Sequence, residues 1–220
     1  MAKVIDQSHN PALGQLLKEM RSREEQKDRH RFRRNMKLIG TLMAYEIAAS
    51  LPSVDTRVET PLGHRSVRVL RQPPVLGTAL RAGVPFLDGM LEVFRDSDVM
   101  FFGASREEGV GPDASLSMKI ALSYQALSPC EGRELIFADP MIATGSTIFD
   151  IHAAITAQKV RPSRFIVAGL VGFLGAAERL EAKIPACEVW LATADDALDA
   201  RGYIVPGLGD AGDLCYGAKA

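Results

Sequence analysis

The stretch LIFADPMIATGSTIFDI, residues Leu135 to Ile151, has the pattern of a buried strand, a tight loop and the start of a helix. Apolar residues open it at 135–137, small and hydroxyl-bearing residues follow at 143–147, and apolar residues return at Ile148. The first amides of a helix have no intrahelical acceptor and lie at the positive end of the helix dipole. Small side chains let a phosphate reach those amides, so the stretch predicts a phosphate-binding turn.

Asp139 lies where the predicted strand ends, and ligands of open α/β sheets bind at that edge. A carboxylate beside a phosphate cup suits sugar hydroxyls better than the phosphate itself. The loop has no Gly-Lys-Ser/Thr ending, which argues against a nucleoside triphosphatase. On these residues alone, an ordinary strand-to-helix turn is an equally good interpretation.

Composition favours one soluble globular domain spanning residues 1–220, with a net charge of −1 that gives no general attraction to nucleic acid or membrane. No apolar run approaches the roughly eighteen residues of a membrane span. Three cysteines without a C-x-x-C motif predict free thiols in a reducing, cytoplasmic setting: Cys130, Cys187 and Cys215. The four scattered histidines make a metal held by protein ligands alone unexpected.

Strand and helix patterns alternate along most of the chain. Apolar strand candidates cover 75–80, 99–102, 135–137, 165–172 and 188–193, and a period-two pattern covers 116–124. Helical patterns fill residues 10–52, and alternating residues near 54–58 and 67–69 predict a hairpin. We therefore expect a mostly parallel sheet flanked by helices.

Two arginines follow predicted strands, as Asp139 does. Arg81 comes after the strand at 75–80, and Arg106 lies in a polar, glycine-rich loop. Guanidinium groups suit bidentate phosphate recognition, although a surface arginine is as common at such places. The basic run 21–34 suggests RNA, but acidic residues interrupt it, so a solvated helix face is the better interpretation.

The chain resembles the uracil phosphoribosyltransferases over nearly its full length. The segments that carry the resemblance occur in the family's order: LMAYEIAASLP, VETPLG, LRAG…LDGMLE, ADPMIATGST and GYIVPGLGDAGD. The last is the most specific. The resemblance implies a phosphoribosyltransferase-type α/β fold with N-terminal helices (10–52), a flexible β-arm (about 104–130) and a C-terminal base-binding loop (202–217).

The activity implied is transfer of ribose 5-phosphate from phosphoribosyl pyrophosphate (PRPP) to uracil, giving UMP and pyrophosphate, with Mg²⁺ bound through the pyrophosphate. The resemblance also implies a homodimer or higher homo-oligomer. Arg81, Arg106 and Asp210 match catalytic positions. The implied PRPP loop consists of Asp139, Pro140, Met141, Ile142, Ala143, Thr144, Gly145, Ser146 and Thr147. The implied uracil contacts are Ile204, Gly209, Asp210 and Ala211.

Several positions depart from the family's pattern, and most surround the pyrophosphate and the arm. Ser146 stands where the family has a second glycine and adds bulk beside the phosphate. Glu107 and Glu108 follow Arg106, Leu127 stands where a lysine is usual, and Leu214 where an arginine is. Two alternatives stay open: a protein that senses UMP or PRPP with little catalysis, and a transferase for another base.

Overall fold

The computed structural model describes residues 2–5, 10–106, 111–113 and 116–218. Its centre is an eight-stranded sheet with strands in the order β1-β10-β9-β7-β4-β5-β6, and β8 pairs with β9 off this path. Only the β5–β6 pairing in this sheet is antiparallel. The sheet strands are β1 (Lys3–Val4), β4 (Val75–Leu80), β5 (Val99–Arg106), β6 (Ile120–Ala126), β7 (Glu134–Ala138), β8 (Met141–Ile142), β9 (Arg164–Phe173) and β10 (Cys187–Asp195).

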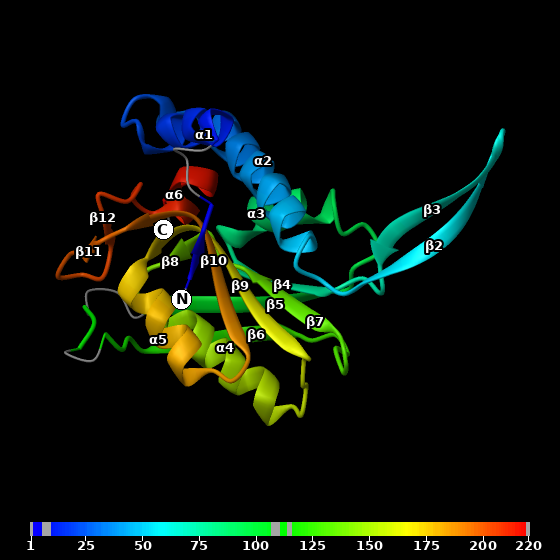
Figure 1. The fold of residues 1–220 in the computed structure, drawn as a ribbon. Coiled ribbons are helices and arrows are strands. Elements are labelled where there is room, and N and C mark those ends of the chain that lie inside the picture. The colour runs from blue at the N-terminus through cyan, green and yellow to red at the C-terminus, as the bar shows by residue number, and fades with distance from the viewer. Residues whose placement is uncertain (1, 6–9, 107–110, 114–115, 219–220) are drawn as a thin grey trace.

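Helices cover both faces of this sheet, as the alternating pattern predicts (Figure 1). One face carries α1 (Pro11–Arg21), α2 (Arg29–Ala48) and α3 (Gly83–Leu91), and the other carries α4 (Ser146–Ala157) and α5 (Leu174–Lys183). A 3₁₀ turn, η1 (Glu25–Lys27), joins α1 to α2, and α6 (Ala211–Tyr216) lies near the C-terminus. The mostly parallel α/β architecture is confirmed.

Strand β7 shows why the sheet is buried on both sides. Ile136 and Ala138 face the core under α2 and α3, whereas Leu135 and Phe137 face the core under α4 and α5. Successive side chains of a strand point to opposite faces, so a strand buried on both faces must be apolar throughout. Burial on both faces therefore explains the continuous apolar run at 135–137.

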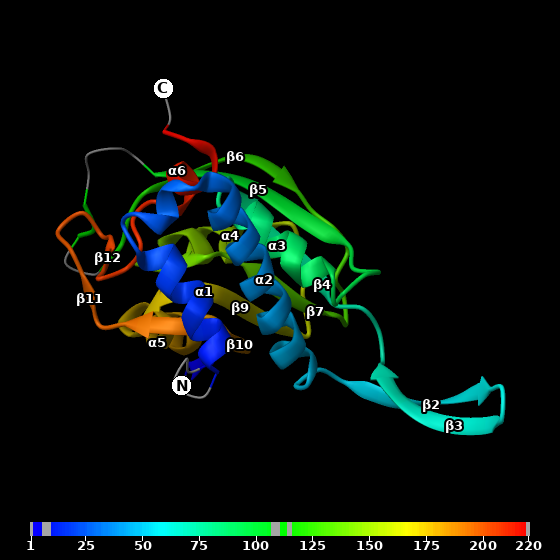
Figure 2. The same ribbon diagram turned by 90° about the horizontal axis from the view of Figure 1, so that it is seen from above.

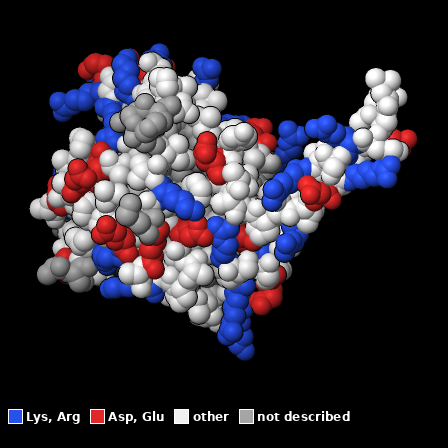
Figure 3. All heavy atoms as spheres, viewed as in Figure 1, with Lys and Arg blue, Asp and Glu red and all other residues white. Residues whose placement is uncertain are grey.

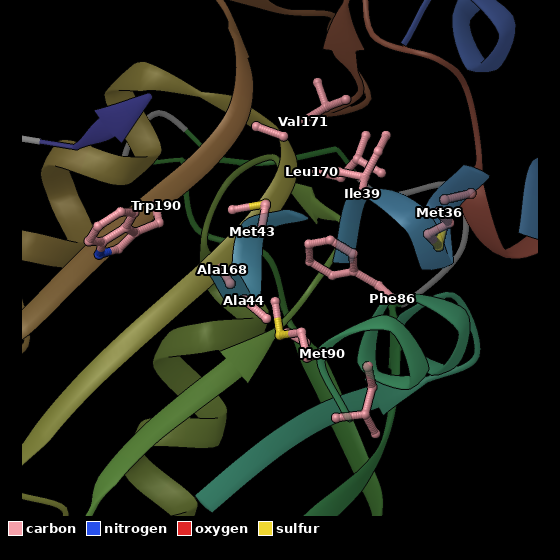
Figure 4. Packing of buried hydrophobic residues seen from close by; sticks show 14 of the residues in the cluster. Met36, Ile39, Met43, Ala44, Phe86, Met90, Ala168, Leu170, Val171 and Trp190 are labelled. Carbon is pink, nitrogen blue, oxygen red and sulfur yellow. The ribbon is translucent and has the colours of Figure 1, made fainter. Parts of the chain in front are cut away.

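Helices α2 and α3 approach each other very closely at two glycines. A Cβ on Gly40 would lie 2.2 Å from the carbonyl oxygen of Phe86, and one on Gly89 would lie 1.9 Å from that of Lys37. Around this contact, Met36, Ile39, Met43, Phe86 and Met90 fill the space against the sheet (Figure 4). The pair fixes where α3, and therefore the turn before it, lies over the sheet.

The predicted N-terminal helix and hairpin are both present. The Asn10 side chain caps α1 by accepting a hydrogen bond from the Leu13 N–H at 3.2 Å. Strands β2 (Ser53–Thr60) and β3 (Gly63–Leu70) form a two-stranded hairpin that projects from the body of the molecule (Figures 1 and 2). A second small pair joins β11 (Ala197–Leu198) and β12 (Ile204–Val205).

One predicted strand begins later than expected. The period-two pattern predicts a strand over 116–124, but β6 starts at Ile120. Leu116 has a positive φ of 60°, and its N–H donates to the Asp113 carbonyl oxygen at 2.9 Å. The alternation at 116–119 therefore belongs to a turn, because a residue in the left-handed region cannot continue a strand.

Candidate active site

The phosphate-binding turn predicted at 139–147 begins at the end of β7. Asp139 follows Ala138, and its Oδ1 accepts a hydrogen bond from the Met141 N–H at 3.1 Å. The Thr78 hydroxyl of β4 donates to the Ala138 carbonyl oxygen at 2.6 Å. Gly83 packs against this bond, since a Cβ there would lie 1.8 Å from Thr78 Oγ1. The glycine of the RAG motif thus lets α3 begin directly over the strand end.

The second half of the turn leads into α4. Gly145 adopts a φ of 81°, which glycine reaches without steric cost. The side chains of Thr144 and Ser146 are buried, and the Thr144 hydroxyl donates to Ser146 Oγ at 3.0 Å. Thr147, one residue on, faces an open cavity. The N–H groups at the start of α4 are therefore presented beside that cavity, the arrangement that favours a phosphate.

The C-terminal loop faces this turn across the cavity, and an ion pair anchors it from behind. Arg21 contacts both carboxylate oxygens of Asp195, at 2.9 and 3.0 Å, and also donates to the Gly207 carbonyl oxygen at 3.2 Å. The Gly207 N–H donates to Asp195 Oδ2 at 2.9 Å. The sharp turn at 207–209 is thus fixed by the end of α1 and the end of β10.

Arg81 joins the two sides of the cavity. Its Nη2 lies 2.8 Å from Asp213 Oδ1, and its Nη1 donates to the Gly217 carbonyl oxygen at 3.1 Å. Asp210 caps α6 by accepting from the Asp213 N–H at 3.0 Å. The arginine that follows β4 therefore holds α6, the helix that follows the predicted base-binding segment.

A cavity of about 760 Å³ lies between these elements. Nine of the predicted site residues line it: Arg81, Asp139, Met141, Ala143, Thr147, Ile204, Gly209, Asp210 and Ala211. Five others are buried behind it: Pro140, Ile142, Thr144, Gly145 and Ser146. Arg106 ends β5, where its backbone pairs with Ile120. Glu107 and Glu108 lie outside the described residues.

Two residues that position the cavity loops were not identified as site residues from the sequence. Asp195 and Arg179 both hold cavity loops in place, and neither occurs in a recognisable motif. Asp195 ends an apolar strand, the same position that drew attention to Asp139, and that signal was available in the sequence. Nothing local marks Arg179, because its partners are main-chain carbonyl groups far away in the chain.

Burial behind the C-terminal loop changes the acidity of one thiol. Cys215 of α6 is fully buried, and this burial raises its pKa to about 11. The carbonyl oxygen of the same residue accepts a hydrogen bond from Arg33 Nη1 at 2.6 Å. All three cysteines are free and buried, so the prediction of free thiols is confirmed.

The basic run at 21–34 forms one ion pair with a distant part of the fold and two exposed pairs within the run itself. Arg21 pairs with Asp195, Lys27 with Glu24 and Arg31 with Asp28. On the face shown in Figure 3, acidic and basic side chains are interspersed, and basic ones gather along the projecting hairpin. This run has the character of helix ends and connectors rather than a continuous basic surface. Among the described residues, none of the helices is both long and apolar enough to cross a membrane.

Comparison with known proteins gives a consistent result. The family model described as uracil phosphoribosyltransferase matches residues 7–218. A uracil phosphoribosyltransferase of Porphyromonas gingivalis is 37% identical over 208 residues, covering 94% of each chain. One of Thermococcus sibiricus is 34% identical over 218 residues, covering 98% of this chain and 90% of its own. The solved structure of the AQ2163 protein from Aquifex aeolicus aligns over the whole of both chains with a TM-score of 0.84 and 25% identity.

Proposed function

The chain belongs to the uracil phosphoribosyltransferase family, and we propose that it transfers ribose 5-phosphate from PRPP to N1 of uracil, giving UMP and pyrophosphate. One observation on the structure of this chain supports the proposal most directly. The predicted phosphate turn and the predicted base loop, some sixty residues apart in sequence, line one cavity of about 760 Å³. A cavity lined in this way suits a nucleotide whose phosphate lies at the turn and whose base lies at the C-terminal loop.

Different residues are proposed to bind different parts of PRPP. The N–H groups around Thr147 face the 5-phosphate, and Asp139, at the strand end, accepts hydrogen bonds from the ribose hydroxyls. Asp139 already accepts from the Met141 N–H, which fixes its carboxylate toward the cavity wall. This arrangement orients C1 of the ribose toward the base loop, and orientation lowers the barrier to transfer.

The base meets a rigid, glycine-rich edge. Uracil presents alternating carbonyl and N–H groups, which main-chain groups near Ile204, Gly209 and Ala211 can match. Gly207 and Gly209 both have positive φ, at 55° and 93°, so the loop follows a path closed to most other residues. The Arg21–Asp195 pair holds that path before the base arrives. A loop already in its binding conformation loses less entropy on binding.

The leaving pyrophosphate needs positive charge. Breaking the bond at C1 builds negative charge on it, and Arg81, whose guanidinium also pairs with Asp213, lines the cavity as a cation for that charge. Arg106 at the end of β5 is the second arginine of the predicted set. No covalent intermediate with the protein is required.

Mg²⁺ is proposed to enter with PRPP. Asp139 and Asp210 line the cavity and are oxygen ligands of the kind that Mg²⁺ accepts, so the donor set fits an ion that takes its other ligands from pyrophosphate and water. Held there, the ion would supply positive charge to the leaving group. Within the described residues, no cluster of three or more histidine, cysteine or acidic side chains forms a separate metal cage.

We also propose a homodimer that covers the projecting hairpin. Val54, Val58, Val67 and Val69 lie on one face of β2–β3, each about 40% exposed, and polar residues occupy the other face. An isolated two-stranded hairpin is at best marginally stable in water. A second copy of the chain packed on the valine face would bury it. A mass of one protomer by light scattering, unchanged with concentration, would contradict the dimer.

The decisive test is product formation. Labelled uracil, PRPP and Mg²⁺ should give labelled UMP and one equivalent of pyrophosphate. Hypoxanthine and orotate in separate reactions test the alternative of another base. Binding of UMP, detected as a raised melting temperature, without any product would instead establish a nucleotide-binding protein.

A further inference from the structure

The turn that precedes β6 lies directly against the phosphate turn. Residues Leu116 to Met118 approach the start of α4, and two side chains hold them there, Ser146 and Arg179. Neither contact belongs to the sheet, and Ser146 is the position at which the chain departs from the family's glycine. These contacts join a segment of the predicted arm to the loop proposed to bind the 5-phosphate.

Ser146 bonds to the neighbouring segment instead of extending into the cavity. Its Oγ accepts hydrogen bonds from the Met118 N–H at 2.9 Å and from the Thr144 hydroxyl at 3.0 Å. The side chain is 6% exposed and does not line the cavity, whereas Met118 does. The added bulk expected beside the phosphate is therefore directed to the arm segment.

Arg179 of α5 ties the same two segments together through their carbonyl groups. Its Nη1 lies 3.2 Å from the Leu116 carbonyl oxygen and 3.2 Å from the Thr144 carbonyl oxygen. Its guanidinium lies 5.5 Å from the centre of the Phe149 ring, which restricts the side chain to this position. One cation thus bridges an arm carbonyl and a phosphate-turn carbonyl.

Met118 also reaches the other half of the cavity. A Cβ built on Gly202 would lie 3.3 Å from Met118 Sδ, so the methionine packs on the C-terminal loop. Its N–H is held by the phosphate turn at the same time. The segment that Ser146 and Arg179 fix is therefore a wall shared by both halves of the cavity.

We propose that Ser146 and Arg179 are positioning residues that latch the Leu116–Met118 segment onto the phosphate turn and so set the cavity wall for PRPP. The inference rests on the proposed transferase function for its kinetic consequence, but the latch itself can be measured without catalysis. It also reverses the simplest expectation for the serine. A serine that crowds the phosphate lowers PRPP affinity, whereas a serine that fixes the wall raises it.

Amide hydrogen exchange of the ligand-free full-length protein tests the latch directly. Ser146→Ala should speed exchange of the Met118 amide about three- to tenfold, since the hydrogen bond that this amide donates is removed. Arg179→Met should act in the same direction. Because both residues hold one segment, the double variant should show less than the product of the single effects. Unchanged exchange at Met118 in both single variants would overturn the proposal.

Matched controls separate the latch from general destabilisation. Ser123→Ala removes a hydroxyl from β6 that donates to the Gly103 carbonyl oxygen at 3.3 Å and does not touch the phosphate turn. It should leave the Met118 amide unchanged. Exchange of the Phe137 amide in the central sheet should be the same in all variants. Faster exchange at both Phe137 and Met118 would mean that Ser146→Ala loosens the whole fold, and the latch would be rejected.

Steady-state kinetics shows whether Ser146 raises or lowers the affinity for PRPP. Ser146→Gly, which restores the residue usual in the family, should raise KM for PRPP about three- to tenfold with kcat within about twofold. A lower KM in this variant would show that the serine obstructs the phosphate, and would overturn the positioning role. If the unaltered protein makes no UMP, the proposed function fails, while the exchange data still decide the latch.

Discussion

The two loops that face each other across the cavity are held in place by different kinds of contact. The phosphate turn is continuous with the sheet: β7 precedes it, β8 within it pairs with β9, and α4 follows it. The C-terminal loop is held by ion pairs between distant parts of the chain. Arg21 pairs with Asp195, and Arg81 pairs with Asp213. The first is stabilised by main-chain pairing, the second by charge.

This difference predicts unequal tolerance of change. A loop built on main-chain pairing loses little when one polar side chain is removed, because the ladder remains. A loop built on a few ion pairs loses its shape when one partner goes and the other is left buried without compensation. The base half of the site should therefore be the more easily disturbed half.

The largest effect is expected from Asp195→Ala. It leaves Arg21 facing the Gly207 carbonyl group without its carboxylate, and the Asp195 side chain is only 9% exposed. We expect a loss of about 3 kcal/mol in the free energy of unfolding, measured by urea denaturation, together with weaker UMP binding. Asp196→Ala, at the exposed neighbouring carboxylate, is the matched control and should change little. Equal stability of the two variants would remove the basis of the comparison.

A pair of glycine substitutions compares the loops at the level of the main chain. Gly207→Ala puts a Cβ 2.2 Å from the Ile204 carbonyl oxygen, so we expect a loss of about 2 to 3 kcal/mol. Gly145→Ala in the phosphate turn meets only the Leu180 side chain, at 3.4 Å, and should cost about 1 kcal/mol for its positive φ. Thermal unfolding of both variants measures the difference. The reverse order would show that the phosphate turn is the more constrained loop.

Asp139→Asn tests the phosphate half through function. The amide oxygen can still accept from the Met141 N–H, so the turn should keep its shape. The ribose hydroxyls lose a charged acceptor, and we expect kcat/KM for PRPP to fall about 30-fold, as for loss of one charge-assisted hydrogen bond. Its melting temperature should stay close to that of the unaltered protein. Full activity in this variant would contradict the role given to Asp139.

The smallest effect concerns Cys215 behind the C-terminal loop. Burial raises its pKa from an ordinary 9.0 to about 11. The folded state therefore favours the neutral thiol. Its contribution to stability is complete below about pH 9 and is lost as the pH rises through about 11. At pH 8 a thiol reagent should modify Cys215 only as fast as the loop opens, and UMP should slow that reaction. A fast, UMP-independent reaction would show that the loop is already open.

Much of the fold could be predicted from sequence because its patterns are local. The apolar run at β7, the asparagine cap of α1 and the hairpin around Gly63 each follow from neighbouring residues. The start of β6 could not be predicted, because the left-handed residue Leu116 carries no turn signature. The exposure of Val205 could not be predicted either: it follows the buried Ile204 in an apolar pair, yet it is 44% exposed because β12 is a short strand that pairs with β11.

The site was predictable only in part for the same reason. Residues that end apolar strands, such as Asp139 and Arg81, are visible in the sequence and do line the cavity. The residues that hold those loops act across long stretches of chain, as Arg21 and Asp195 do at a separation of 174 residues. Pattern analysis over a short window cannot pair them.

That separation has a consequence for the order in which the molecule is made. Arg21 leaves the ribosome early, but its partner Asp195 is synthesised 174 residues later, which is roughly 9 to 35 s at common elongation rates. The phosphate turn and the strands that pair with it are synthesised before Asp195, since β9, which pairs with β7 and β8, ends at Phe173. During vectorial synthesis the turn proposed to bind the sugar phosphate therefore leaves the ribosome before the ion pair that fixes the loop proposed to bind the base can form.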